Sequence, residues 1–190
     1  KISLQVFPEG GDIIAGCENV IAFKAVNEFN KPADVSGIVT DDAGVQVASF
    51  KSLHQGMGTF AFLPQAHHTY TVTVTHPAQT TVVLPDALPQ GFALHADVSN
   101  KQYINVNVEA TQPEVVSMVA QVRGSIYYAT EWTLQAGKNN LVIPTAAFPM
   151  GVCQLTLFDS KEIERCERLV FVGYDKRLNV AISTDKEYYG

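Results

Sequence analysis

Apolar and polar residues alternate with a period of two along most of the chain. In the segment ISLQVF, Ile2, Leu4 and Val6 fall on one face and the polar residues between them fall on the other. The segment TYTVTVTH repeats the pattern, with threonines between Tyr70 and the valines that follow it. This alternation predicts β-strands that pack one face on a core and turn the other face to solvent.

Strand-like segments follow one another closely in the first half of the chain. Besides the two segments above, they are NVIAFKAV, VSGIVTD, VQVASFKS, GTFAFLP and TTVVL, and turn sequences such as FNKP, DDAG and HQGMG separate them. About seven short strands in fewer than about ninety residues are typical of an immunoglobulin-like sandwich.

The segment PDALPQGF interrupts the pattern with two prolines and a glycine, so we expect a linker near Pro85 to Gly91. Alternation then restarts in FALHADV, YINVNVEA, VVSMVAQV, SIYYATEWTL, NLVIPTAAF, VCQLTLFD, ERLVFV and RLNVAIST. A short helix competes only in QPEVVSMVAQV, where the β-branched residues favour a strand. The sequence therefore predicts an all-β protein.

These segments predict two tandem immunoglobulin-like β-sandwich domains, over residues 1–86 and 90–176. Residues 177–190 are interpreted as the opening strand of a third domain that the sequence does not include. The residues predicted to form the cores are Leu4, Val6, Phe23, Phe60, Phe62, Tyr70, Val72, Val106, Leu134, Leu155, Leu157, Leu169 and Phe171.

Composition narrows the classes of function. The chain is 46% hydrophobic and 17% charged, which is typical of folded protein and excludes a disordered tail. A net charge of -6 with scattered lysines and arginines argues against nucleic-acid binding, which needs a basic surface. No apolar run approaches the roughly 18 residues that span a bilayer, so we expect no membrane insertion by this segment.

Cys17, in the stretch GGDIIAGCENVIAFKA, is a candidate for thiol chemistry. Its surroundings look like the Gly-Cys-Gly-Glu-Gln motif that forms an internal thioester. That ring needs a glutamine three residues after the cysteine, and this position holds Val20. Cys17 is therefore predicted to be a passive residue in a turn that leads into a strand.

Other catalytic and metal-binding patterns are incomplete. His67 and His68 are adjacent, so an extended chain would point them to opposite faces, and Asp41-Asp42 supplies too few oxygens for a calcium loop. No Gly-x-Ser-x-Gly motif is present. The sequence predicts no catalytic residue, no cofactor and no metal site. The remaining histidines, expected in exposed loops, are His54, His76 and His95.

Cys153 and Cys166 flank a predicted hairpin and could form a disulfide if they faced each other. The outcome depends on the register of the second strand. The favoured register sends Arg168 to solvent and turns Leu169 and Phe171 inward, which points Cys166 away from Cys153.

The aromatic segment SIYYATEW allows two interpretations. Tyr127 and Trp132 could line a groove for a glycan or a peptide, because these side chains offer flat apolar faces with a polar tip. Alternation favours the other interpretation, in which Ile126, Tyr128 and Trp132 belong to the core.

The stretch from FPEGGDIIAGCENV to HHTYTV resembles a domain of macroglobulin-like multidomain proteins in the envelope of Gram-negative bacteria. Shared features are the paired glycines at the strand exit of residues 7–12 and the DDAG hairpin turn, and the segment CQLTLFDSKEIERCERLVFV is similar to a closing macroglobulin-type hairpin. The thioester of that family lies in a different domain. The resemblance implies non-catalytic spacer and interaction modules within a larger exported protein, in the periplasm or at the cell surface. The implied partners are neighbouring domains of the parent protein and another envelope protein.

Overall fold

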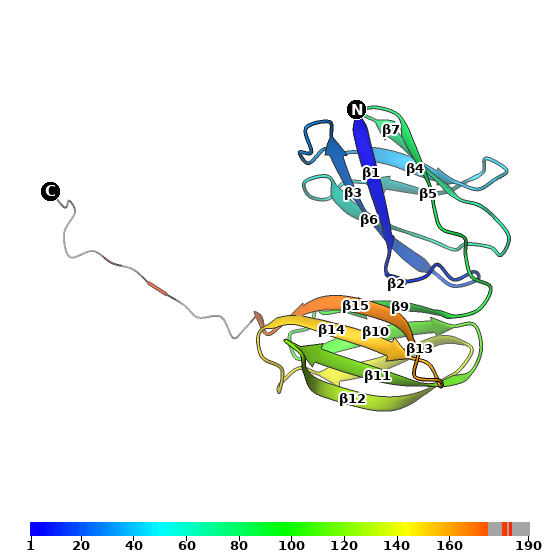
Figure 1. Ribbon diagram of the computed structural model, residues 1–190. Helices are drawn as coiled ribbons and strands as arrows, with labels where there is room; N and C mark the ends of the chain where they lie inside the picture. Colours follow the sequence, from blue (N-terminus) through cyan, green and yellow to red (C-terminus); the bar gives the residue numbers. More distant parts are fainter. Residues whose placement is uncertain (175–179, 182, 184–190) are drawn as a thin grey trace.

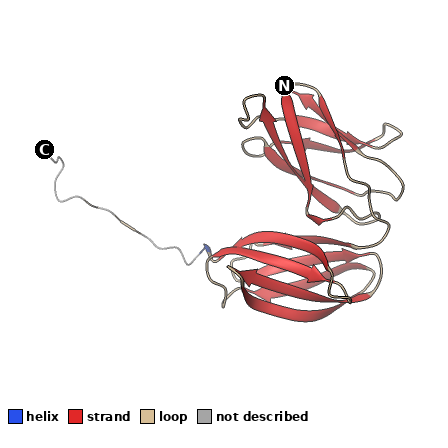
Figure 2. Ribbon diagram, viewed as in Figure 1, coloured by secondary structure: helices blue, strands red, loops and turns tan. Residues whose placement is uncertain are grey.

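The computed structural model describes residues 1–174, 180, 181 and 183. This part of the chain forms fifteen β-strands and contains no α-helix, so the all-β prediction is confirmed (Figure 2). It also holds no helix that could cross a bilayer. The strand predicted over residues 177–190 falls almost wholly outside the described residues.

The first sandwich is built from the N-terminal half of the chain (Figure 1). Its smaller sheet has the order β1 (Ile2–Pro8), β3 (Asn19–Asn27) and β6 (Met57–Phe62). Its larger sheet has the order β5 (Gln46–Lys51), β4 (Ser36–Thr40), β7 (Thr71–His76) and β8 (Thr80–Val83). Every strand pairing is antiparallel.

The second sandwich follows residue 91 and repeats this plan. Its smaller sheet has the order β13 (Gly137–Pro144), β10 (Tyr103–Ala110) and β9 (Phe92–Asp97). Its larger sheet has the order β12 (Ser125–Leu134), β11 (Glu114–Val122), β14 (Gly151–Phe158) and β15 (Glu164–Val172). A two-residue strand from the other half of the chain, β2 (Gly10–Gly11), pairs with the outer edge of β15.

Both sandwiches share one connectivity. If β2 is left out, the first, second and fifth strands of each sandwich form the smaller sheet, and the fourth, third, sixth and seventh form the larger sheet in that order. This division of seven strands into two facing sheets is the immunoglobulin-like sandwich. Loops that occupy equivalent places in the connectivity therefore lie at equivalent ends of the two sandwiches.

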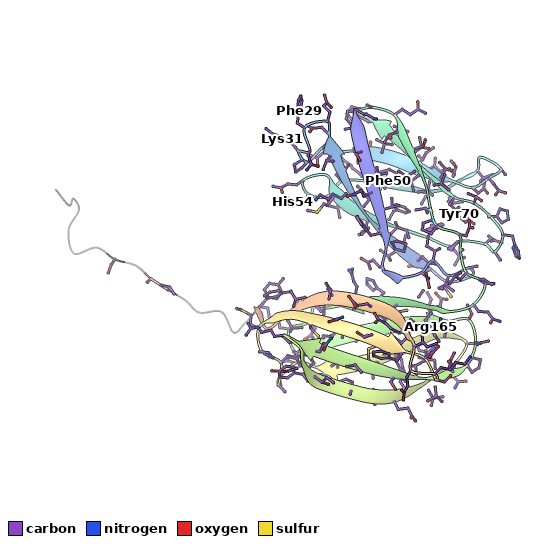
Figure 3. All side chains as sticks on the ribbon, in the orientation of Figure 1. Phe29, Lys31, Phe50, His54, Tyr70 and Arg165 are labelled. Atoms are coloured by element: carbon purple, nitrogen blue, oxygen red, sulfur yellow. The ribbon has the colours of Figure 1, made fainter. Side chains whose placement is uncertain are left out.

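Each sandwich encloses its own hydrophobic core. The first core includes five aromatic rings in contact, and Phe50 and Tyr70 belong to it (Figure 3). The second core is mostly aliphatic and includes Met118, Leu155 and Phe148. The predicted core residues from Leu4 to Leu157 are all buried, except that Val6 is partly buried and packs against the first core.

Strand β15 has the opposite register to the one predicted. Leu169 is 55% exposed and Phe171 lies on the same outer face, whereas Cys166, Val170 and Val172 are buried. Arg168 shares the inward face and pairs across the ladder with a buried leucine. The prediction was wrong because it assumed that an arginine must face solvent, and here the arginine meets a buried carboxylate.

The same register explains why Cys153 and Cys166 are free thiols. Both side chains are buried on the core side, contrary to the predicted orientation of Cys166. Cys153 lies opposite Val170, however, and Cys166 lies opposite Leu157. The two cysteines are thus offset by about four residues along the ladder, or roughly 13 Å, which is too far for a disulfide.

Candidate functional site at the junction of the two sandwiches

The connection between β1 and β3 leaves the first sandwich and lies against the second (Figure 1). We call residues Glu9–Glu18 the junction loop. Its second and third residues are Gly10 and Gly11, whose φ angles of 86° and 123° favour glycine. A side chain at Gly10 would also sit 3.3 Å from the carbonyl oxygen of Leu94 in the second sandwich. The paired glycines predicted at this strand exit therefore allow the loop to pair with β15.

Glu9 is the centre of a cluster of charged side chains at the junction. Its side chain is only 5% exposed although it is ionisable. One carboxylate oxygen lies 2.7 Å from an Arg168 Nη atom, and the other lies 3.3 Å from His95 Nδ1. Both partners belong to the second sandwich, so this junction cluster of Glu9, His95 and Arg168 ties the two halves together.

His95 corrects a prediction made from sequence. It was expected in an exposed loop, but it lies on β9 with its side chain about half exposed. The hydrogen bond with Glu9 raises the pKa of His95 above its usual range, against the opposing effects of burial and of the Arg168 charge. Within the described residues, the Nε atom of Arg168 is buried with no hydrogen-bond partner.

The apolar part of the junction loop is fixed to the predicted linker. Ile13 and Ile14 are almost completely buried. The Leu88 amide donates to the Ile13 carbonyl at 2.8 Å, and the Ala15 amide donates to the Leu88 carbonyl at 2.9 Å. The linker is therefore held in a short parallel bridge against the junction loop rather than extended between the sandwiches.

Cys17 lies where the junction loop returns to the first sandwich. The residue is 2% exposed, and its thiol sits 3.8 Å from the carbonyl oxygen of Glu109 in the second sandwich. Burial, with a smaller effect from the Glu109 charge, raises the pKa of this thiol to about 11. The Glu109 carboxylate also accepts a hydrogen bond from the Glu18 amide at 3.0 Å. Cys17 is thus protonated at neutral pH and is poorly suited to nucleophilic chemistry.

Asn19 sets the shape of this turn. Its side-chain oxygen accepts from the Ile14 amide at 2.9 Å, and its side-chain nitrogen donates to the carbonyls of Ile14 and Cys17, each at 2.8 Å. These three hydrogen bonds are buried and close the loop on itself. Asn19 is therefore tolerated in a buried position because its side chain supplies hydrogen bonds to backbone groups that would otherwise lack partners.

A cavity of about 490 Å³ opens beside the junction. Two of the acidic groups on its wall are held by neighbouring residues. Asp159 accepts from Arg165 at 2.8 Å and from backbone amides of its own hairpin turn, and Glu114 accepts from Ser160 at 2.8 Å. These contacts stabilise the hairpin between β14 and β15 and attach it to the start of β11. The residues that line the cavity are Asp12, Ile14, Leu88, Gln90, Gly91, Phe92, Gln112, Pro113, Glu114, Asp159, Ser160, Lys161 and Arg165.

The aromatic strand β12 lies away from the junction, on the outer edge of the second sandwich. Its pairing with β11 skips Tyr127, so a bulge shifts the alternation. Ile126 is consequently 63% exposed, which corrects its predicted place in the core, whereas Tyr128 and Trp132 pack against the core as expected. The Tyr127 ring lies 5.5 Å from the ring of buried Phe148. A ligand-binding role for Tyr127 and Trp132 stays a prediction.

Comparison with known proteins finds similar arrangements only among solved structures. No family model and no curated protein matches the chain. A domain of a biofilm-associated protein is similar with 15% identity and a TM-score of 0.41, over 88% of this chain and 29% of that one. A DUF4785 family protein from Legionella pneumophila is similar with 13% identity and a TM-score of 0.32, over 90% of this chain and 57% of that one. Salmonella alpha-2-macroglobulin is similar with 10% identity and a TM-score of 0.35, over 99% of this chain and 18% of that one. The chain thus spans between about a fifth and three fifths of the length of these proteins.

Proposed function

We propose that this chain is a non-catalytic structural module, a pair of β-sandwiches whose relative orientation is fixed so that it spaces and orients neighbouring domains. The observation that carries the proposal is the junction cluster, in which the buried Glu9 carboxylate of one sandwich binds Arg168 and His95 of the other. A carboxylate removed from water in this way needs both of its partners in place.

Two separate connections join the sandwiches. The covalent linker crosses once, and the junction loop crosses independently by pairing β2 with β15. A single linker allows neighbouring domains to reorient, whereas a second attachment removes that freedom. A module built in this way transmits a fixed geometry from one end of the molecule to the other.

The wider setting of this proposal follows the resemblance described above. Spacer modules of macroglobulin-like envelope proteins act inside larger exported chains, so we place this pair in the periplasm or at the cell surface. Neighbouring domains of the parent protein and other envelope proteins would be its partners.

Distances between spin labels on the two sandwiches test the fixed orientation. Exposed Gln46 and Thr133 can be changed to cysteine and labelled, because the three native thiols are buried. We expect a narrow distance distribution in the labelled chain, and a clearly broader one after Glu9→Ala. The matched control is Glu28→Ala, which removes an exposed ion pair with the N-terminal amine beside Phe29 at the far end of the first sandwich (Figure 3).

Two results would contradict the proposal. A broad distribution in the labelled chain itself would show that the sandwiches reorient freely. An equally narrow distribution after Glu9→Ala would show that the junction cluster does not set their orientation.

A further inference from the structure

Two loops of the first sandwich meet at the same end of its larger sheet. The turn at residues 41–45 follows β4, and the loop at residues 63–70 precedes β7. The last residue of β4, Thr40, pairs with the first residue of β7, Thr71. The antiparallel ladder therefore places the two loops side by side, although Asp42 and His68 are 26 residues apart in the sequence.

Three side chains with metal-binding atoms converge between these loops. Nδ1 of His68 lies 2.7 Å from Oδ1 of Asp42. Asp41 lies beside them, and one ligand atom from each of the three residues falls within 4.8 Å of the other two. Among the described residues, this is the group in which three or more histidine, cysteine or acidic side chains come so close.

The backbone already orients one of the three ligands. Oδ1 of Asp41 accepts hydrogen bonds from the amides of Ala43 at 3.0 Å and Val45 at 2.8 Å. Both bonds use the same oxygen, and they hold the carboxyl group in place at the start of the turn. The ordered carboxyl group of Asp41 therefore stands beside Asp42 and His68.

The separations suit a small divalent ion. Imidazole nitrogen and carboxylate oxygen bind zinc at about 2.0–2.2 Å, so neighbouring ligand atoms in a tetrahedral site lie about 3.4 Å apart. The His68 and Asp42 atoms are already closer than this, and small rotations of these two exposed side chains toward the fixed carboxyl group of Asp41 cover the remaining difference. Three ligands leave a fourth position for water.

The ligand types decide which ion fits. Calcium takes six to eight oxygen ligands, and magnesium prefers oxygen in octahedral geometry, so a site with an imidazole and two carboxylates suits neither well. Imidazole favours zinc, nickel and copper. In the sequence, His67 and His68 were expected to point to opposite faces, and Asp41-Asp42 supplies too few oxygens for calcium. The fold brings His68 to the two aspartates and so combines the two groups.

We propose that Asp41, Asp42 and His68 form a surface binding site for a divalent transition metal ion, with Zn²⁺ as its representative. The ion displaces the proton between His68 Nδ1 and the Asp42 carboxylate, which is released to solvent, and it bridges the turn after β4 to the loop before β7. This proposal is independent of the proposed spacer function, because it concerns neither the junction loop nor the second sandwich.

Isothermal titration of the untagged chain with zinc chloride tests the site, since an affinity tag of histidines would bind zinc itself. We expect one equivalent of Zn²⁺ to bind, and at least a tenfold loss of affinity after His68→Ala and after Asp42→Asn. The matched controls are His67→Ala, which removes the adjacent imidazole, and Asp86→Asn, which removes an exposed carboxylate elsewhere. Both controls should bind as the parent chain does.

Asp41→Asn gives a further test that preserves the turn. The asparagine oxygen can still accept from the Ala43 and Val45 amides, so the loop should keep its shape while the site loses a charged ligand. We expect weaker zinc binding with an unchanged circular dichroism spectrum. The proposal is overturned if one equivalent of zinc does not bind, if His68→Ala leaves the affinity unchanged, or if His67→Ala weakens it as much.

Discussion

At the scale of single residues, the junction depends on charges that stabilise one another away from water. The Glu9 side chain is almost fully buried, and the Arg168 side chain is 31% exposed. Removing one partner of such a pair leaves the other charge uncompensated, which typically costs about 3–5 kcal/mol for a fully buried pair and less for one that is partly hydrated. The strength of the junction therefore depends on both partners being present.

His95 makes the junction sensitive to pH. Its pKa is raised in the folded protein, chiefly by the hydrogen bond with Glu9, while the charges of Arg168 and Asp97 lower and raise it respectively. Folding therefore favours the protonated imidazole, and this contribution is fully present below the unfolded pKa of about 6.5 and is lost as pH rises through the higher folded value. We expect the stability difference between the parent chain and His95→Gln to be largest near pH 5.5 and to shrink toward pH 8.

Nuclear magnetic resonance titration of His95 and urea unfolding at several pH values measure this effect. In Glu9→Gln, the pKa of His95 should move back toward its ordinary value, which provides the control. A pKa for His95 at or below about 6.5 in the parent chain would contradict the assignment.

At the scale of single elements, strand alternation is reliable until a bulge or a buried charge interrupts it. In β12, the bulge at Tyr127 changes the face on which Ile126 lies. In β15, Arg168 occupies an inward position that would otherwise hold an apolar side chain. Both elements are strands as predicted, and the errors concern only which residues they bury.

Among the described glycines, Gly37 in β4 has the least space for a side chain. A Cβ atom there would lie 2.1 Å from the Thr73 carbonyl oxygen and 2.6 Å from the Phe50 ring. The carbonyl belongs to the neighbouring strand and cannot move without breaking the ladder. We expect Gly37→Ala to lower the free energy of unfolding by about 3 kcal/mol, measured by urea denaturation.

Gly44→Ala is the comparison for this prediction. Gly44 has a φ of 78° and open space around its Cα, so the substitution adds backbone strain alone, at about 1–2 kcal/mol. If Gly37→Ala cost no more than Gly44→Ala, the close packing of β4 against β7 and β5 would be disproved.

At the scale of the whole molecule, two sandwiches with the same strand connectivity are joined through the junction loop, which has no counterpart in that shared connectivity. The junction loop adds β2 to the larger sheet of the second sandwich, and its isoleucines hold the linker. Each sandwich has a core of its own, so its folding is not obliged to depend on the other. The junction is what couples them.

This coupling should be visible in unfolding curves. The single tryptophan of the chain, Trp132, lies in the second sandwich and reports on that half alone, whereas far-ultraviolet circular dichroism follows both halves. We expect urea curves from the two signals to coincide in the parent chain and to separate after Glu9→Ala. Curves that differ in the parent chain would show that the sandwiches unfold independently.

The sequence by itself determined the strands, the all-β class and nearly all of the predicted core. It did so because a strand buries alternate side chains, and this requirement is met within a few neighbouring residues. The paired glycines that let the junction loop turn were also visible, since left-handed backbone angles favour glycine wherever they occur.

Only the tertiary structure decided the register of β15, the junction cluster and the group of Asp41, Asp42 and His68. For the junction cluster, the sequence signal was an arginine within an otherwise apolar inward stripe, but its partner Glu9 lies at the other end of the chain. The free energy of burying a charge, or of holding a metal ion, depends on which groups meet in space. The pairing of the strands decides which groups come together, and a local pattern of residues does not reveal that pairing.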